Sequence, residues 1–144
     1  MTTVSIGGAS REYVRIEVHG YERPPVGEFH DVNWLTVRVS VSAGAFSGAF
    51  DAAFLTEELV AFLEQLKRLH SSLSGEAVFS TLEEQLSLRL IGDGRGHIAL
   101  TGACVDIAGT GNRLEFSLAL DQTHLSSAIQ QLNELVRSFP VRAG

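Results

Sequence analysis

The composition of this 144-residue chain is that of a globular protein, because 44% of its residues are hydrophobic and 19% are charged, which excludes a wholly disordered chain. Its 17 acidic residues outnumber its 11 basic ones and give a net charge of −6. This charge argues against direct nucleic-acid binding, which needs clustered Lys and Arg, and is compatible with a basic protein partner. The length suits a single domain over residues 1–144.

Alternating apolar and polar residues predict three strands in the first part of the chain. The predicted strands span residues 13–21, 34–41 and 46–54. A loop with consecutive prolines separates the first two, because proline cannot donate to a β-ladder. The phenylalanines of the third strand are spaced four residues apart, which also fits a helix, but the nearby Gly44 and Gly48 favour a strand.

A helix is predicted next, beginning at Thr56 and ending between Ser72 and Gly75. Thr56 is expected to cap it, and the acidic Glu57 and Glu58 complement the helix dipole in its first turn. The apolar residues that follow have helical spacing. They are Leu59, Phe62, Leu63, Leu66 and Leu73.

Four further strands and a closing helix complete the chain. The strands are expected over residues 76–82, 86–91, 97–107 and 114–120, and the helix over residues 125–139. The glycine-rich Gly92-Asp-Gly-Arg-Gly96 lies between two of these strands, so it predicts a hairpin turn and not a phosphate-binding loop, which would precede a helix. Asp121 or Thr123 is expected to cap the last helix, and Pro140 to end it.

These elements predict an α+β fold with two layers. Their order is β-β-β-α-β-β-β-β-α, with an extra edge strand over residues 4–7. The sheet is expected to be mostly antiparallel and to contain six to eight strands, because the connections are short. Two amphipathic helices packed on one face leave the other face open. Leu118 and Ile129 are expected to be buried where the helices meet the sheet.

The expected compartment is the cytoplasm. The N-terminal residues lack the basic and long apolar segments of a secretory signal, and no uncharged apolar run reaches the ~18 residues that a membrane helix needs. We therefore predict no membrane partner. Cys104 is the single cysteine, so no internal disulfide is expected, and its neighbours favour a small buried residue in a strand.

No pattern typical of an active site or metal centre occurs in the chain. The five histidines are not spaced as HxH, HxxxH or HExxH, the usual signatures of a metal site. Ser47 misses the central position of a G-x-S-x-G elbow by one residue. The carboxylates of residues 57–58 and 83–84 are sequence neighbours, not groups that converge across a cleft. The sequence therefore predicts no enzyme, no catalytic residue, no cofactor and no metal.

The outward-facing residues of the first two strands form the candidate binding surface. Residue types that are enriched at binding hot spots occur there as Tyr13, Arg15, Tyr21, Trp34 and Arg38. If the two strands pair directly, all five lie on one face, and Trp34 is the best single anchor. The alternative is that these residues are strand formers that pack against their cross-strand neighbours.

Several segments resemble the WapI-like family of bacterial immunity proteins. The matching features are His19-Gly-Tyr21, Ser47-Gly48, the helix with Phe62 and Leu66 that leads into Leu73-Ser-Gly-Glu76, the hairpin Gly94-Arg-Gly-His-Ile98, and the run from Leu114-Glu-Phe through Asp121-Gln-Thr-His-Leu125 to Phe139-Pro140. They mark turns, caps and core positions over nearly the whole chain. The resemblance implies a small cytoplasmic partner of a wall-associated toxin with a tRNA-cleaving tip, and it carries over no catalytic motif.

Together these observations predict a non-enzymatic protein-binding domain whose partner is a cognate toxin domain. Inhibitors of nucleases are frequently acidic, because the nuclease site is basic and complementary charge raises the association rate. The alternative is a scaffold or self-associating subunit, and therefore a homo-oligomer, that uses the open sheet face. A third reading is a small-ligand or enzymatic domain whose site has no recognisable signature.

Overall fold

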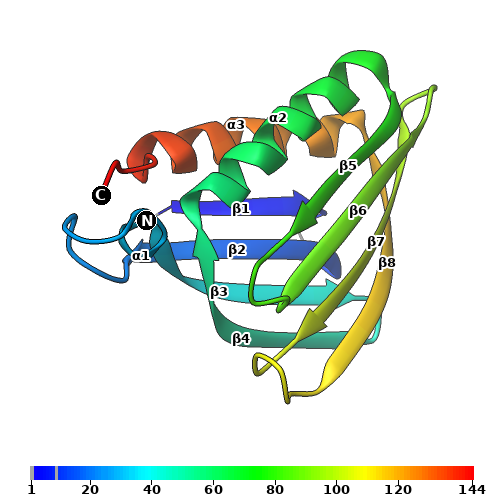
Figure 1. The fold of residues 1–144 in the computed structure, drawn as a ribbon. Coiled ribbons are helices and arrows are strands. Elements are labelled where there is room, and N and C mark those ends of the chain that lie inside the picture. Colours follow the sequence, from blue (N-terminus) through cyan, green and yellow to red (C-terminus); the bar gives the residue numbers. More distant parts are fainter. Residues whose placement is uncertain (1, 9) are drawn as a thin grey trace.

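The structure, a computed structural model, describes residues 2–8 and 10–144. Eight strands form two antiparallel four-stranded sheets, each with its strands in sequence order (Figure 1). The first sheet contains β1 (Thr2–Gly7), β2 (Glu12–Tyr21), β3 (Trp34–Ala43) and β4 (Phe46–Leu55). The second contains β5 (Ser74–Ser80), β6 (Leu86–Asp93), β7 (His97–Val105) and β8 (Arg113–Asp121). The helices are α1 (Phe29–Val32), α2 (Thr56–Ser72) and α3 (Gln122–Ser138).

The predicted α+β class, the antiparallel pairing and the two long helices are confirmed, and the expected extra edge strand is β1. The eight strands form two sheets and not the single sheet that was expected, because the periodicity within a strand does not reveal which strands pair. The division follows from α2, whose 17 residues span about 25 Å and carry the chain from the end of β4 to the start of β5. The four-residue helix α1 is too short to leave a periodic pattern in the sequence.

The apolar faces of both sheets and both long helices enclose one hydrophobic core. Fully buried residues of this core include Leu35 and Val37 of the first sheet, Leu90 and Leu100 of the second, Leu66 of α2 and Leu132 of α3. Each strand contributes alternate residues to this core, as expected for sheets that are covered on one face. The polar faces of both sheets therefore point outward.

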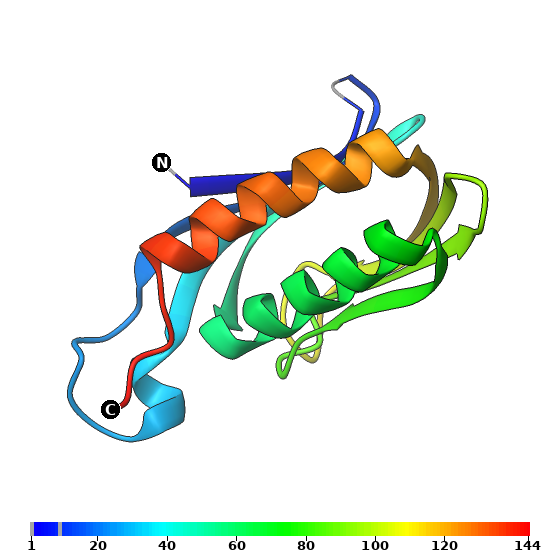
Figure 2. The same ribbon diagram turned by 90° about the horizontal axis from the view of Figure 1, so that it is seen from above.

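Each long helix lies beside an edge strand of one sheet, α3 along β1 and α2 along β5 (Figure 2). The N–H of Ser5 in β1 donates to Oε1 of Gln131 in α3 at 2.6 Å, and the N–H of Val78 in β5 donates to Oε1 of Gln65 in α2 at 2.8 Å. These side chains satisfy backbone groups that an uncovered edge offers to other chains. None of the helices within the described residues is long and apolar enough to cross a membrane.

The caps of the two long helices differ in how well the sequence predicts them. Asp121 caps α3 as expected, because its carboxylate accepts hydrogen bonds from the N–H groups of Thr123 (2.9 Å) and His124 (3.2 Å). The prediction that Thr56 caps α2 is wrong. Leu55 is the N-cap residue, and the carboxylate of Glu58 accepts its N–H at 2.7 Å and that of Leu82 at 2.6 Å. Glu58 therefore also holds the β5–β6 turn against the start of α2.

The predicted Gly92–Gly96 hairpin joins β6 and β7. Gly94 has a φ of +86°, a backbone conformation that suits glycine. The carboxylate of Asp93 accepts hydrogen bonds from the N–H groups of Arg95 (2.7 Å) and His97 (3.1 Å), and these bonds lower the pKa of Asp93. The N–H of Gly94 also donates to the carbonyl of Leu73 at 2.7 Å, which ties the hairpin to the end of α2.

A buried glutamine links the two sheets. Gln85, which is 6% exposed, precedes β6, and its amide nitrogen lies 3.4 Å from the carbonyl oxygen of Asp51 in β4. The same nitrogen lies 3.2 Å from the carbonyl of Val105 and 3.4 Å from that of Asp106, at the end of β7. One amide therefore bridges the edge of the first sheet and the connection between β7 and β8.

We expect Leu118→Ala to lower the free energy of unfolding by about 2–5 kcal/mol, the cost of a core cavity, in urea denaturation. Leu118 is 4% exposed and faces Leu100 in the neighbouring strand, whereas Ile129 is only partly buried against the core. The matched control is Ser117→Ala on the exposed side of the same strand. A loss below about 0.5 kcal/mol, as for surface substitutions, would contradict this placement of Leu118.

Candidate functional site

The outer face of the first sheet is the side turned away from the core. It carries four of the five residues that the sequence predicted for a binding surface. The two predicted strands pair directly as β2 and β3, with Tyr13 opposite Ser42 and Arg15 opposite Ser40. Arg38 lies opposite Glu17 on one side and Asp51 on the other. Because directly paired residues share a face, Tyr13, Arg15 and Arg38 lie together on this surface.

Both arginines of this face are held by neighbouring side chains. The guanidinium of Arg15 lies 4.3 Å from the centre of the Tyr13 ring, and its Nε donates to the hydroxyl of Ser5 at 3.2 Å. Arg38 donates to the carboxylate of Asp51 at 3.0 Å. Such exposed pairs contribute little to stability, but they hold the side chains in defined positions.

Trp34 also has its side chain on the outer side, but at the opposite end of the sheet from Tyr13. It pairs with Leu55, the last residue of β4, and is half-buried. Trp34 and Ser42, which faces Tyr13, are separated by about 27 Å along β3 at ~3.4 Å per residue. The outer face therefore does not gather its aromatic residues into one compact patch.

The expectation that Tyr21 shares this face is wrong. The pairing of β2 with β3 shifts between Val18 and Gly20, so that Tyr21 lies opposite the buried Leu35. One extra residue in a strand turns every later side chain to the other face. Its hydroxyl donates to the carbonyl of Pro140, and the guanidinium of Arg142 lies 3.6 Å from the centre of its ring. Tyr21 thus holds the C-terminal segment.

The C-terminal segment is held by a second group of contacts, around the buried Asn33. The Asn33 side chain donates to the carbonyl of Arg142 at 2.9 Å and accepts its N–H at 2.7 Å. The guanidinium of Arg142 donates to the carbonyls of Val32 (2.9 Å) and Arg23 (2.8 Å). Burial raises the pKa of Tyr21, and the charge of Arg142 opposes that change. These contacts stabilise the fold and leave Tyr21 poorly placed for a partner.

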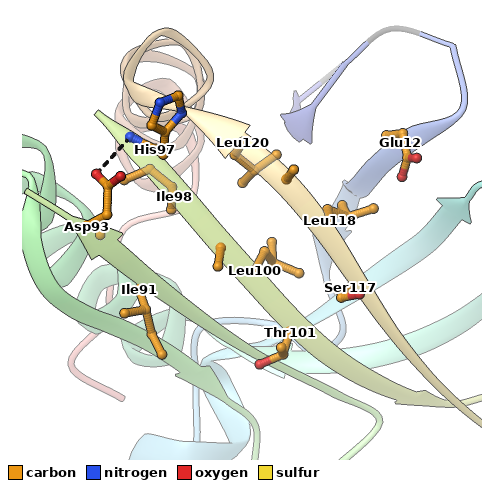
Figure 3. Close-up of a pocket in the computed structure, with 13 residues that line it drawn as sticks. Glu12, Ile91, Asp93, His97, Ile98, Leu100, Thr101, Ser117, Leu118 and Leu120 are labelled. Carbon is orange, nitrogen blue, oxygen red and sulfur yellow. Dashed lines mark hydrogen bonds between the residues drawn. The ribbon is translucent and has the colours of Figure 1, made fainter. Parts of the chain in front are cut away.

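The outer face of the second sheet is a surface that the sequence reasoning missed. A shallow hollow of about 660 Å³ extends over β6, β7 and β8, as Figure 3 shows with Ile91, Thr101 and Ser117 along its floor. Its outward residues in the middle of β7 and β8 are small and neutral, Ile91 beside them is 43% exposed, and the charged pair Arg89–Glu76 lies on the same face outside the hollow. The outward Ala99, Thr101, Ser117 and Ala119 were visible in the alternation, but small residues carry no hot-spot signal.

A second cavity opens between the two sheets. This seam cleft, of about 280 Å³, is lined by Val41, Phe46–Phe50, Cys104, Asp106 and Asn112–Leu114. Most of its wall is apolar and reaches the side chains of Phe50 and Cys104 at the margin of the core. Burial raises the pKa of the Cys104 thiol, so the thiol stays protonated at neutral pH. The cleft is therefore suited to an apolar group.

The three surfaces are suited to contact with another molecule. Within residues 2–8 and 10–144, no three His, Cys, Asp or Glu side chains gather closely enough to hold a metal ion. The two carboxylates with lowered pKa values have structural roles: Asp121 caps α3 and Asp93 organises a hairpin, and their hydrogen bonds lower both pKa values. What the geometry offers is shape, exposed apolar area and paired charges.

A model of the immunity protein WapI-like family matches residues 5–140 of the chain. The chain belongs to this family. The match covers both sheets and both long helices, so the family assignment applies to the whole fold. The resemblance seen in the turns, caps and core positions of the sequence is thereby confirmed.

Neither curated proteins nor solved structures add to the family assignment. No curated protein matches the sequence. A solved structure similar to the chain is that of the siderocalin Ex-FABP, described as functioning through dual ligand specificities. It is 11% identical, with 96% of this chain and 77% of that chain covered, at a TM-score of 0.27, and a similarity this distant carries no inference.

We expect Tyr21→Ala to lower the free energy of unfolding by about 1–3 kcal/mol, within the range of substitutions that remove packing and a hydrogen bond. Tyr21→Phe is the matched control, because it keeps the ring beneath Arg142 and against Phe139 and loses only the hydroxyl. It should cost about 0.5–1.5 kcal/mol. Urea denaturation measures both. Equal stability of the alanine variant and the wild type would contradict the anchoring role.

Proposed function

We propose that this protein is a cytoplasmic immunity protein that neutralises a cognate bacterial toxin by binding it, without catalysing a reaction. The observation that supports this most is the match of the immunity protein family over residues 5–140. The outer faces of the two sheets and the seam cleft also support the proposal, because they offer contact area and arginine side chains that their neighbours hold in place. Protein binding is what such surfaces do most readily.

The toxin that fits best is a basic one, such as a tRNA-cleaving nuclease domain. Nucleases bind a polyanion and therefore expose Lys and Arg. This chain carries a net charge of −6, which attracts such a domain over long distances and raises the association rate. Increased salt should accordingly slow association more than it speeds dissociation.

The outer face of the first sheet is our candidate for the toxin-binding surface. Arg15 and Arg38 are held in place there by Ser5 and Asp51, and pre-organised side chains lose less entropy on binding. Tyr13 supplies an aromatic ring beneath Arg15. Trp34 supplies a large half-buried indole at the far end of the same face. The outer face is long enough for both ends to contact one toxin domain.

We expect Trp34→Ala to weaken toxin binding by about 2 kcal/mol or more, the loss typical of an aromatic hot spot, with Arg38→Ala weaker in effect. Each variant is co-expressed with a candidate cognate toxin domain, and cell survival at limiting expression is scored alongside the dissociation constant. Ile91→Ala, on the outer face of the second sheet, is the matched control. It removes an apolar side chain that is 43% exposed on a different surface.

The experiment distinguishes a wrong choice of binding surface from a wrong proposed function. Full protection by the Trp34 and Arg38 variants, with loss of protection by the Ile91 variant, would move the interface to the second sheet. A wild-type protein that neither binds the toxin domain nor protects cells from it would contradict the proposed function itself. In that case self-association, measured by light scattering, is the next function to test.

A further inference from the structure

The edge of β4 differs from the edges that the helices cover. The carbonyl of Asp51 and the N–H of Leu55 both bond to groups on the side away from β3. Because backbone groups alternate in direction along an antiparallel strand, those of Ser47 and Ala49 point the same way. No hydrogen bond to these groups is formed by any residue in the described part of the chain. They are free to pair with another strand.

The residues of this edge lack the usual protection against strand pairing. Natural edge strands carry lysine, proline or bulges that prevent another chain from adding to them. Between Phe46 and Phe50 β4 has none of these, and its pairing with β3 is regular throughout. Phe46 is 67% exposed at the start of the strand. One backbone N–H of β1 and one of β5 donate to helix side chains, Gln131 and Gln65, whereas in β4, among the described residues, such side-chain bonds occur only beyond Phe50, at Asp51 and Leu55.

The seam cleft opens directly beside this edge. Gly48 and Phe50 of β4 line it together with Cys104 and Leu114 of the second sheet. Gly48 lies opposite Val41 on the inner side, and a Cβ added to Gly48 would meet no atom within 4 Å. A strand laid along β4 would direct alternate side chains inward, toward the cleft. Free backbone groups beside a cavity are the two parts of strand-addition recognition.

Carboxylates gather where β4 runs into α2. Glu58 bonds to the N–H groups of Leu55 and Leu82. Burial raises the pKa of Glu58, and the nearby charges of Glu57 and Glu83 raise it further, whereas the two hydrogen bonds act in the opposite direction. Asp51 lies four residues before Leu55 on the outer face, where its carboxylate is paired with Arg38. A strand that passes this end of β4 is therefore favoured if it carries Lys or Arg there.

We propose that the open part of β4, from Ser47 to the amide of Asp51, accepts an extended strand from the toxin partner, which extends the first sheet, places an apolar side chain in the seam cleft and directs a basic residue toward the carboxylates at the start of α2. The proposal rests on the proposed function and names the part of the chain that holds the partner. A basic partner is favoured over a second copy of this chain, since two copies that each carry −6 repel one another.

The direct test is amide hydrogen exchange of the ¹⁵N-labelled protein, alone and with an inactivated form of the toxin domain that it protects against. The amides of Ser47, Ala49 and Asp51 should exchange quickly in the free protein and at least tenfold more slowly in the complex. Binding without protection of these amides would overturn this proposal and leave the proposed function standing. No binding at all would overturn both. Protection that grows with protein concentration in the absence of toxin would identify a second copy as the occupant and overturn the choice of partner.

Two variants at the edge give an independent test. Ala49→Pro removes the outward N–H and blocks an added strand, yet keeps the pairing with β3, because proline is tolerated where the N–H faces away from the sheet. It should weaken toxin binding by about tenfold or more, whereas Ala49→Ser, which keeps the N–H, should bind within about twofold of the wild type. Gly48→Leu fills the cleft without touching the backbone edge and should weaken binding to a similar extent. Unchanged binding by both Ala49→Pro and Gly48→Leu, each with a wild-type melting curve, would overturn the proposal.

Discussion

Neither four-stranded sheet can bury its apolar face alone, and the rest of the structure depends on the single core that the two sheets share. α2 and α3 close this core on the side where β1 and β5 end the sheets. Gln131 and Gln65 bond to the backbone of those two edges, so the helices that complete the core also prevent strand addition there. The same arrangement leaves both polar faces and the edge of β4 outside, which is where a partner can bind.

The features that the sequence predicted correctly are those that depend on residues adjacent in the chain. The alternation in every strand, the Gly92–Gly96 hairpin and the Asp121 cap each arise from a few adjacent positions, and each is present. The split into two sheets depends on which strands meet after α2, and such long-range pairing leaves no periodic signal. The N-cap of α2 is Leu55 instead of Thr56, and Glu58 accepts the N–H of Leu55 and also that of Leu82, 24 residues away. A local pattern cannot reveal that second contact.

The residues predicted for the binding surface also depend on strand pairing that a local sequence pattern does not reveal. Tyr13, Arg15 and Arg38 share a face because the pairing of β2 with β3 is regular up to Val18. The irregularity beyond Val18 turns Tyr21 inward, where it joins Pro140 and Arg142. A residue type enriched in interfaces is equally useful for packing a terminal segment, so composition alone could not distinguish these roles. The small outward residues of the second sheet carry no such composition signal, and only the structure reveals the hollow they form.

The outer face of the first sheet and the edge of β4 are physically continuous. Asp51 belongs to both, since its carboxylate holds Arg38 on the outer face while its carbonyl bonds to Gln85. A strand added along β4 would become a fifth strand of the first sheet, and its outward side chains would lie beside the row that contains Arg38. Main-chain pairing at the edge is insensitive to sequence, whereas the side chains in the cleft and on the outer face are selective. A protein built in this way can derive affinity from one strand and specificity from the surface that the strand extends.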